Sequence, residues 1–113
     1  MVDSSVLAST HWDTYVKKIL EVHDEHPHII EKCGHHYRLG FIDGFKYGKE
    51  SEGEEVDARA LASKQWELHV RKILEGFGED PDLIRKCGVH FRLAFIHGFK
   101  HGVESEKEAQ VHY

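Results

Sequence analysis

The sequence predicts an all-α fold, a four-helix bundle-like domain made of two tandemly duplicated helical hairpins. Residues 2–51 and 56–105 align without a gap at an offset of 54 residues, and more than half of the aligned positions are identical. In each copy, apolar residues recur at helical spacing in two successive segments. Two copies of one supersecondary unit favour a closed pair related by a pseudo-two-fold axis over an extended repeat array.

The first segment of each copy is expected to be an amphipathic helix. Asp3 and Asp57 are placed to cap its start, because a short acidic side chain can accept hydrogen bonds from the first free backbone N–H groups. Turns are expected at residues 24–27 and 78–81, where Pro27 and Pro81 suit the first position of the next helix. The predicted core stripe contains Ala8, Trp12, Tyr15, Val16, Ile19 and His23, matched by Ala62, Trp66, His69, Val70, Ile73 and Phe77.

The second helix of each copy is expected to run to about residue 48 or 102 and to have two apolar faces. One face is rich in glycine and aromatic residues. The opposite face carries Leu39 and Ile42 in the first copy and Leu93 and Ile96 in the second. A helix with two apolar faces is expected to contact protein on both sides, within the domain or across a subunit boundary.

Small residues spaced four apart predict a groove along the second helices. A glycine inside a helix costs roughly 0.5–1 kcal/mol relative to alanine, so close approach of another helix is expected to offset that cost. For the last glycine of each row, a left-handed helix cap is an equally good interpretation. The rows are Gly40, Gly44 and Gly48 in the first copy and Ala94, Gly98 and Gly102 in the second.

Length and composition indicate a single domain, residues 1–113, with an acidic linker at residues 50–57 and a polar tail that frays from Glu104. The net charge is −5 and acidic and basic residues are interleaved, so no basic surface for nucleic acid is expected. Neither an apolar run long enough to span a membrane nor a signal-peptide pattern occurs, which favours a cytoplasmic protein. Two cysteines are too few for a disulfide framework and fit a reducing compartment.

A Cys-x-x-His pair occurs in each copy, and the pseudo-symmetry suggests a zinc site. Cys33, His36, Cys87 and His90 would supply the four sulfur and nitrogen ligands of tetrahedral zinc. The favoured alternative is that the cysteines are small core residues, because free cysteine is among the most buried residue types. Haem held by His36 and His90 is a weaker alternative, since it needs space between the helices.

The chain contains 11 histidines, and most of them have a different residue at the equivalent position of the other copy. His97 and His101 are four residues apart on one helix, a spacing that can chelate a transition metal, but Asp43 and Tyr47 replace them in the first copy. This pair is therefore interpreted as a surface feature.

Arg38 and Arg92 follow the repeated histidines and could bind an anionic ligand together with them. Pairing with carboxylates of the same helix is the favoured alternative for surface arginines. Neither cysteine has a base and an orienting acid nearby in sequence, so binding or interaction is favoured over catalysis. We expect a self-associating homodimer or a complex with another protein.

Overall fold

The computed structural model describes residues 3–51 and 54–111, with side chains up to Lys107, and this part of the chain contains helices and no strands. The all-α, four-helix prediction is confirmed. The first hairpin contains α1 (Ser4–His11), η1 (Trp12–Val16), α2 (Lys17–Val22) and α3 (Pro27–Glu50). The second contains α4 (Ala58–Gln65), η2 (Trp66–Val70), α5 (Arg71–Gly76) and α6 (Pro81–Val111).

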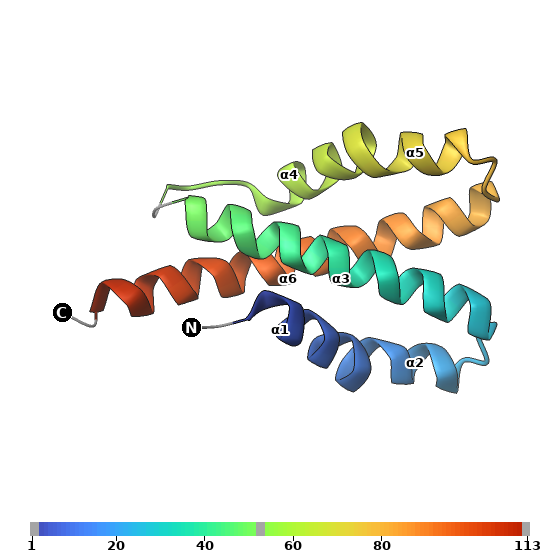
Figure 1. The fold of residues 1–113 in the computed structure, drawn as a ribbon, viewed down its shortest axis with the longest axis horizontal. Helices are drawn as coiled ribbons and strands as arrows, with labels where there is room; N and C mark the ends of the chain where they lie inside the picture. Colours follow the sequence, from blue (N-terminus) through green and yellow to red (C-terminus); the bar gives the residue numbers. More distant parts are fainter. Residues whose placement is uncertain (1–2, 52–53, 112–113) are drawn as a thin grey trace.

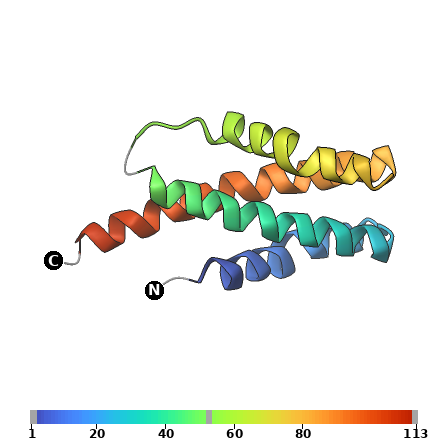
Figure 2. The ribbon, with the colours of Figure 1, turned by 45° about the horizontal axis from the view of Figure 1, so that its top comes forward.

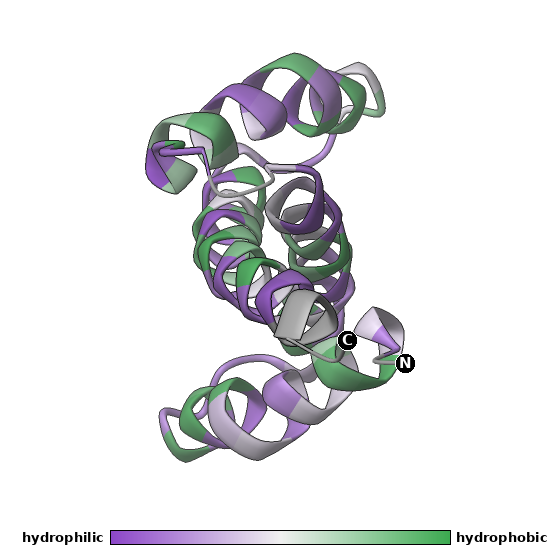
Figure 3. Ribbon diagram, turned by 90° about the vertical axis from the view of Figure 1, so that its left-hand side faces the viewer, coloured by the Kyte–Doolittle hydropathy of each residue, from purple (hydrophilic) through white to green (hydrophobic). Residues whose placement is uncertain are grey.

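The two long helices, α3 and α6, form the centre of the molecule and run in the same direction (Figure 1). The first helix of each hairpin covers the outside of this pair, α1 and α2 against α3, and α4 and α5 against α6. Viewed along the helices, these outer segments lie on opposite sides of the central pair (Figure 3), and the turned view in Figure 2 shows the same order. The hydrophobic core therefore follows the contact between α3 and α6.

The close contact between α3 and α6 depends on the glycine rows. A Cβ atom placed on Gly44 would overlap the carbonyl oxygen of Phe95, and one placed on Gly98 would overlap that of Phe41. An added Cβ would also overlap a carbonyl oxygen of the partner helix at Gly40, Gly48 and Gly102. Each glycine Cα–H bond thus points at a backbone oxygen, a geometry in which weak Cα–H···O hydrogen bonds form.

Gly48 and Gly102 belong to this row and are not left-handed caps. Both lie inside helices, and among the described glycines the left-handed backbone occurs at Gly78, with φ of +71°. That residue and its counterpart Asp24, with φ of +56°, form the hairpin turns. Aspartate is one of the few side chains that tolerates this conformation.

Each first helix is interrupted at the same place by a π turn, Trp12–Val16 and Trp66–Val70. A π turn holds one more residue than an α turn, so every residue after it is rotated relative to the expected face. As a result, Leu20 and Leu74 pack on the core, whereas Ile19 and Ile73 are each 58% exposed. The predicted stripe is correct for Ala8, Trp12 and Val16 and for Ala62, Trp66 and Val70, which are buried or pack on the core. It is wrong for its other members, which are exposed: Tyr15, Ile19, His23, His69, Ile73 and Phe77.

Helix starts match the predicted caps. Asp3 accepts a hydrogen bond from the Ser5 N–H at 2.9 Å, and Asp57 accepts two, from Arg59 and Ala60. At the starts of α3 and α6, the His26 ring and the Asp80 carboxylate accept hydrogen bonds from the backbone two residues on. Side chains therefore satisfy N–H groups that the first helical turn leaves free.

Two helix ends differ from the expectation. α3 continues to Glu50, where the Ser51 hydroxyl donates a 2.8 Å hydrogen bond to the Gly48 carbonyl. α6 continues as a helix to Val111, through the polar tail that was expected to fray.

The expected second apolar faces are partly covered, since Ile42 and Ile96 pack on the core while Leu39 and Leu93 are 42% and 49% exposed. Within the described ranges, all helices are too short or too polar to cross a lipid bilayer.

Candidate functional site

The predicted zinc ligands lie around the pseudo-two-fold axis, with the two cysteines in contact at its centre. Cys33 and Cys87 are each 1% exposed and hydrogen-bond to each other. This contact, and then hydrogen bonding to His90, lower the pKa of the Cys33 thiol, and the same contact raises that of Cys87. Because the two residues occupy equivalent positions and touch, a negative charge on either thiol opposes ionisation of the other.

His36 and His90 each turn toward the tryptophan of the opposite copy. The His36 ring meets Trp66 edge-on at 5.8 Å, and the His90 ring meets Trp12 at the same distance. Burial, followed by the nearby charges of His35 and Lys32, lowers the pKa of His36 to about 4. Its ring is therefore neutral near pH 7.

The four predicted ligands do not form a metal centre in this arrangement. Among the described residues, no three His, Cys, Asp or Glu side chains are placed so that they could hold one ion. The cysteines meet, but each histidine ring packs edge-on against an indole, and the four side chains do not surround one point. A haem between His36 and His90 is also disfavoured, because α3 and α6 are in backbone contact along the following turns.

Two grooves of about 680 and 520 Å³ lie within the hairpins, one between the first and second helices of each copy. Nine lining positions of one groove are equivalent to nine of the other. The first groove is lined by Trp12, Asp13, Lys17, Glu21, Asp24, Glu25, Pro27, Ile30, Glu31 and Arg38, and the second by Trp66, Glu67, Arg71, Glu75, Glu79, Pro81, Ile84, Arg85 and Arg92.

The π turns position the groove residues. Each tryptophan begins its π turn and packs on a glycine of the second helix, where a Cβ on Gly34 would lie 2.7 Å from the Trp12 indole. The indole edge thereby becomes part of the groove wall, beside a proline and an isoleucine of the second helix. π turns occur frequently at functional sites, and here both copies have one.

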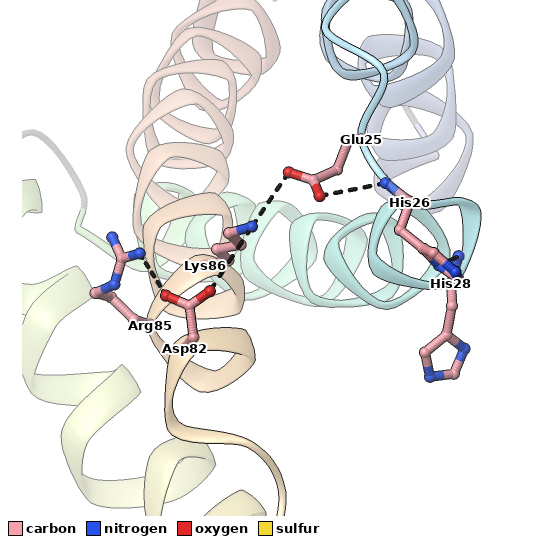
Figure 4. A network of polar contacts seen from close by, with 6 residues as sticks. All are labelled: Glu25, His26, His28, Asp82, Arg85 and Lys86. Carbon is pink, nitrogen blue, oxygen red and sulfur yellow. Dashed lines mark hydrogen bonds and ion pairs between the residues drawn. The ribbon is translucent and has the colours of Figure 1, made fainter.

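Ion pairs bind the acidic residue at each hairpin turn to the other hairpin. Lys86 of α6 lies 3.3 Å from Glu25, and Lys32 of α3 lies 2.9 Å from Glu79. Figure 4 shows Lys86 between Glu25 and a second carboxylate, that of Asp82. The hydrogen bond from Lys86 also lowers the pKa of Glu25. These reciprocal pairs hold the two hairpins together at their turns.

Arg38 and Arg92 line the grooves without a carboxylate partner. Both are half-buried, and across residues 3–51 and 54–107 neither is within ion-pair distance of an Asp or Glu. In the second groove, by contrast, Arg71 pairs with Glu67 at 2.8 Å. The favoured expectation that these two arginines pair with carboxylates of their own helix is not met.

A third pocket of about 350 Å³ adjoins the first groove and brings Arg38 together with His36, His35 and Lys32. Arg38 lines both spaces. In this pocket the predicted combination of His36 and Arg38 lines a common space.

Sequence reasoning did not predict the grooves, and the repeat gives no consistent charge signal for them. Charge is preserved between the copies at some groove positions, as in Asp13 and Glu67 or Lys17 and Arg71, but it is reversed where Glu31 is replaced by Arg85. At other exposed positions the residue type differs between the two copies, as where His28 is replaced by Asp82.

Comparison with known proteins gives no family model, no curated protein and no solved structure that matches this chain.

Proposed function

We propose that the protein is a binding protein with two equivalent sites, one in each hairpin groove, for a ligand with an anionic group and an apolar body. The observation that carries this proposal is the position of Arg38 and Arg92, which are half-buried, lack carboxylate partners and line equivalent grooves. Each site would bind its anion at the arginine and its apolar part against the tryptophan, isoleucine and proline.

The chemistry of an arginine supports an anionic ligand. The planar guanidinium offers paired N–H donors that match the two oxygens of a carboxylate, phosphate or sulfonate. A partly buried cation without a partner loses hydration and gains little in return, so a bound anion would relieve that cost. Two of the acidic groove residues, Glu25 and Glu79, are already paired with Lys86 and Lys32.

The groove walls favour binding over catalysis. The lining residues of the two grooves include no Ser, Thr, Cys or His side chain that could act as an activated nucleophile. The two thiols of the chain are buried on the axis, away from both grooves. Acidic, basic and aromatic side chains remain, which suit recognition of a charged and partly apolar molecule.

A titration with 2-naphthalenesulfonate tests this function. Replacing both arginines, Arg38→Gln with Arg92→Gln, is expected to weaken binding by about 10- to 100-fold, since a hydrogen bond to a charged group contributes about 1.5–3 kcal/mol. Calorimetry measures the affinity, and tryptophan fluorescence gives a second readout because Trp12 and Trp66 are the two tryptophans of the chain and both line grooves.

Arg59→Gln is the matched control, because Arg59 is an exposed arginine outside both grooves. The control should bind like the unmodified protein. Equal affinity in the control and the double variant, or no binding by the unmodified protein, would show that the grooves are not sites for such anions.

Self-association through the outer apolar residues is a second candidate function. Leu39 and Leu93 are exposed at equivalent positions of α3 and α6, and Ile19 and Ile73 are exposed at equivalent positions of the outer helices. In a symmetric dimer each copy presents the same surface to the other, and the exposed leucine of either hairpin could contribute to such a surface. This candidate rests on residues that do not line the grooves.

Native mass measurement tests the association. The unmodified protein is expected to be a dimer, and Leu39→Lys with Leu93→Lys is expected to give a monomer with an unchanged helical spectrum, since both residues are already exposed. Lys18→Gln, at an exposed polar position, is the control and should remain dimeric. A monomeric unmodified protein would contradict the association.

A further inference from the structure

The two hairpin grooves share most of their wall residues but differ in charge. Five acidic and two basic side chains line the first groove, whereas three acidic and three basic side chains line the second. Two positions account for the whole difference. Glu31 of the first groove is replaced by Arg85 in the second, and Asp24 lines the first groove where the second copy has Gly78. The first groove is therefore the more acidic by three charges.

Ion pairs with residues outside the grooves do not remove this difference. The acidic residue at each hairpin turn is paired with a lysine of the other hairpin, equally in both copies. Arg85 lies 2.6 Å from Asp82, but both side chains are more than 60% exposed, and exposed pairs of this kind contribute little. The Arg85 guanidinium can therefore turn to a bound ligand at small cost. Where side chains are described, Glu31 has no lysine or arginine within ion-pair distance.

The charges of the first groove are separated along α3. Glu31 and Arg38 are seven residues apart, which is about two helical turns or 10 Å, so both lie on the same face of the helix. Between them is Gly34, on which the Trp12 indole packs. The groove thus has a cation at one end, an aromatic wall in the middle and a carboxylate at the end nearer the hairpin turn. In the second groove, Arg85 places a cation at that end instead.

We propose that Glu31 and Arg85 give the two grooves different ligand specificities. The first groove would bind amphoteric ligands, which have an ammonium group about 10 Å from their anionic group, with the apolar body between the two. The second groove would bind anions that lack such a cation, because Arg85 repels it. Opposite charges attract the correct ligand and like charges exclude the wrong one. This inference rests on the proposed function, since it assumes that each anion binds at the groove arginine.

Two probes of nearly equal shape test the specificity, 6-(aminomethyl)-2-naphthoate and 6-ethyl-2-naphthoate. They share a carboxylate and an aromatic body, and an ammonium group in the first replaces a methyl group in the second. Arg92→Gln leaves the first groove intact and Arg38→Gln leaves the second, so calorimetry of each variant measures one groove. At low ionic strength, the ammonium probe should bind about threefold more tightly than the ethyl probe to Arg92→Gln. The order should be reversed in Arg38→Gln, since one exposed ion pair changes an affinity by up to about fivefold.

Exchanging the two residues tests their role directly. Glu31→Arg, combined with Arg92→Gln, should remove the preference of the first groove for the ammonium probe. Arg85→Glu, combined with Arg38→Gln, should give that preference to the second groove. Glu50→Arg, combined with Arg92→Gln, is the matched control, because Glu50 is an exposed residue of α3 that lines neither groove. The control changes the net charge equally and should keep the preference for the ammonium probe.

The outcomes separate this inference from the proposed function. If both probes bind but the two grooves show the same preference, or if Glu31→Arg has no more effect than its control, the inference is overturned and the proposed function stands. If neither probe binds to either single-groove variant, the proposed function and the inference fail together.

Discussion

Gly44→Ala combined with Gly98→Ala is expected to destabilise the protein by about 2–6 kcal/mol, because each new methyl group meets backbone and not a movable side chain. Overpacking at one buried site costs about 1–3 kcal/mol, and the atoms in the way here are the carbonyl oxygens of Phe95 and Phe41. The two long helices can admit the methyl groups only by moving apart along their whole contact. Since an ordinary domain is stable by about 5–15 kcal/mol, much of the stability would be lost.

Urea denaturation of this variant measures the loss, and Gly76→Ala is the matched control. Gly76 lies in helix α5 and has open space where its Cβ would be, so alanine there should stabilise the helix by roughly 0.5–1 kcal/mol. Replacing glycine by alanine is thus expected to lower the free energy of unfolding at Gly44 and Gly98 and to raise it at Gly76. Stabilisation of the Gly44 and Gly98 variant would show that the central helices are not in backbone contact.

Stability is expected to fall as the pH is lowered from about 6.5 to about 4, and His36 should account for up to about 3 kcal/mol of the fall. The pKa of His36 is about 4 in the folded protein because the ring is buried, against 6.5 for an ordinary histidine. Between these values the unfolded chain binds a proton that the folded chain does not, so acid favours unfolding. The contribution is fully present above pH 6.5 and lost by pH 4.

His36→Phe tests this origin of the pH dependence. A phenyl ring can keep the edge-on contact with Trp66 and has no proton to bind, so the variant should lose less stability than the unmodified protein between pH 6.5 and pH 4. His28→Gln, at an exposed position of the same helix, should leave the pH dependence unchanged. Parallel stability curves for the unmodified protein and the phenylalanine variant would exclude His36 as the cause.

The duplication made the architecture predictable from the sequence, down to individual caps. Asp3 and Asp57 could be assigned because capping depends on local sequence, and the glycine rows because a repeated cost implies a repeated close contact. The favoured prediction that the two cysteines are small core residues holds, since each is 1% exposed. The contact of each neighbouring histidine with the opposite tryptophan was not predicted, because it depends on packing between the hairpins.

The candidate sites could not be predicted from the sequence, for two physical reasons. A π turn adds one residue to a helical turn without a distinct residue pattern, so the shift of the core face from Ile19 to Leu20 could not be anticipated. The grooves depend on that shift. Contacts between residues far apart in the chain were equally out of reach, as where the contact of α1 with α6 brings His11 beside His101.

The number of ligands bound per chain tests most directly the claim that the two hairpins form equivalent sites. Native mass spectrometry of the untagged protein with 2-naphthalenesulfonate should show two bound molecules per chain. Arg38→Gln alone and Arg92→Gln alone should each reduce the number to one, because each arginine lines one of the two grooves. A single bound molecule in the unmodified protein, or two in both single variants, would contradict the claim.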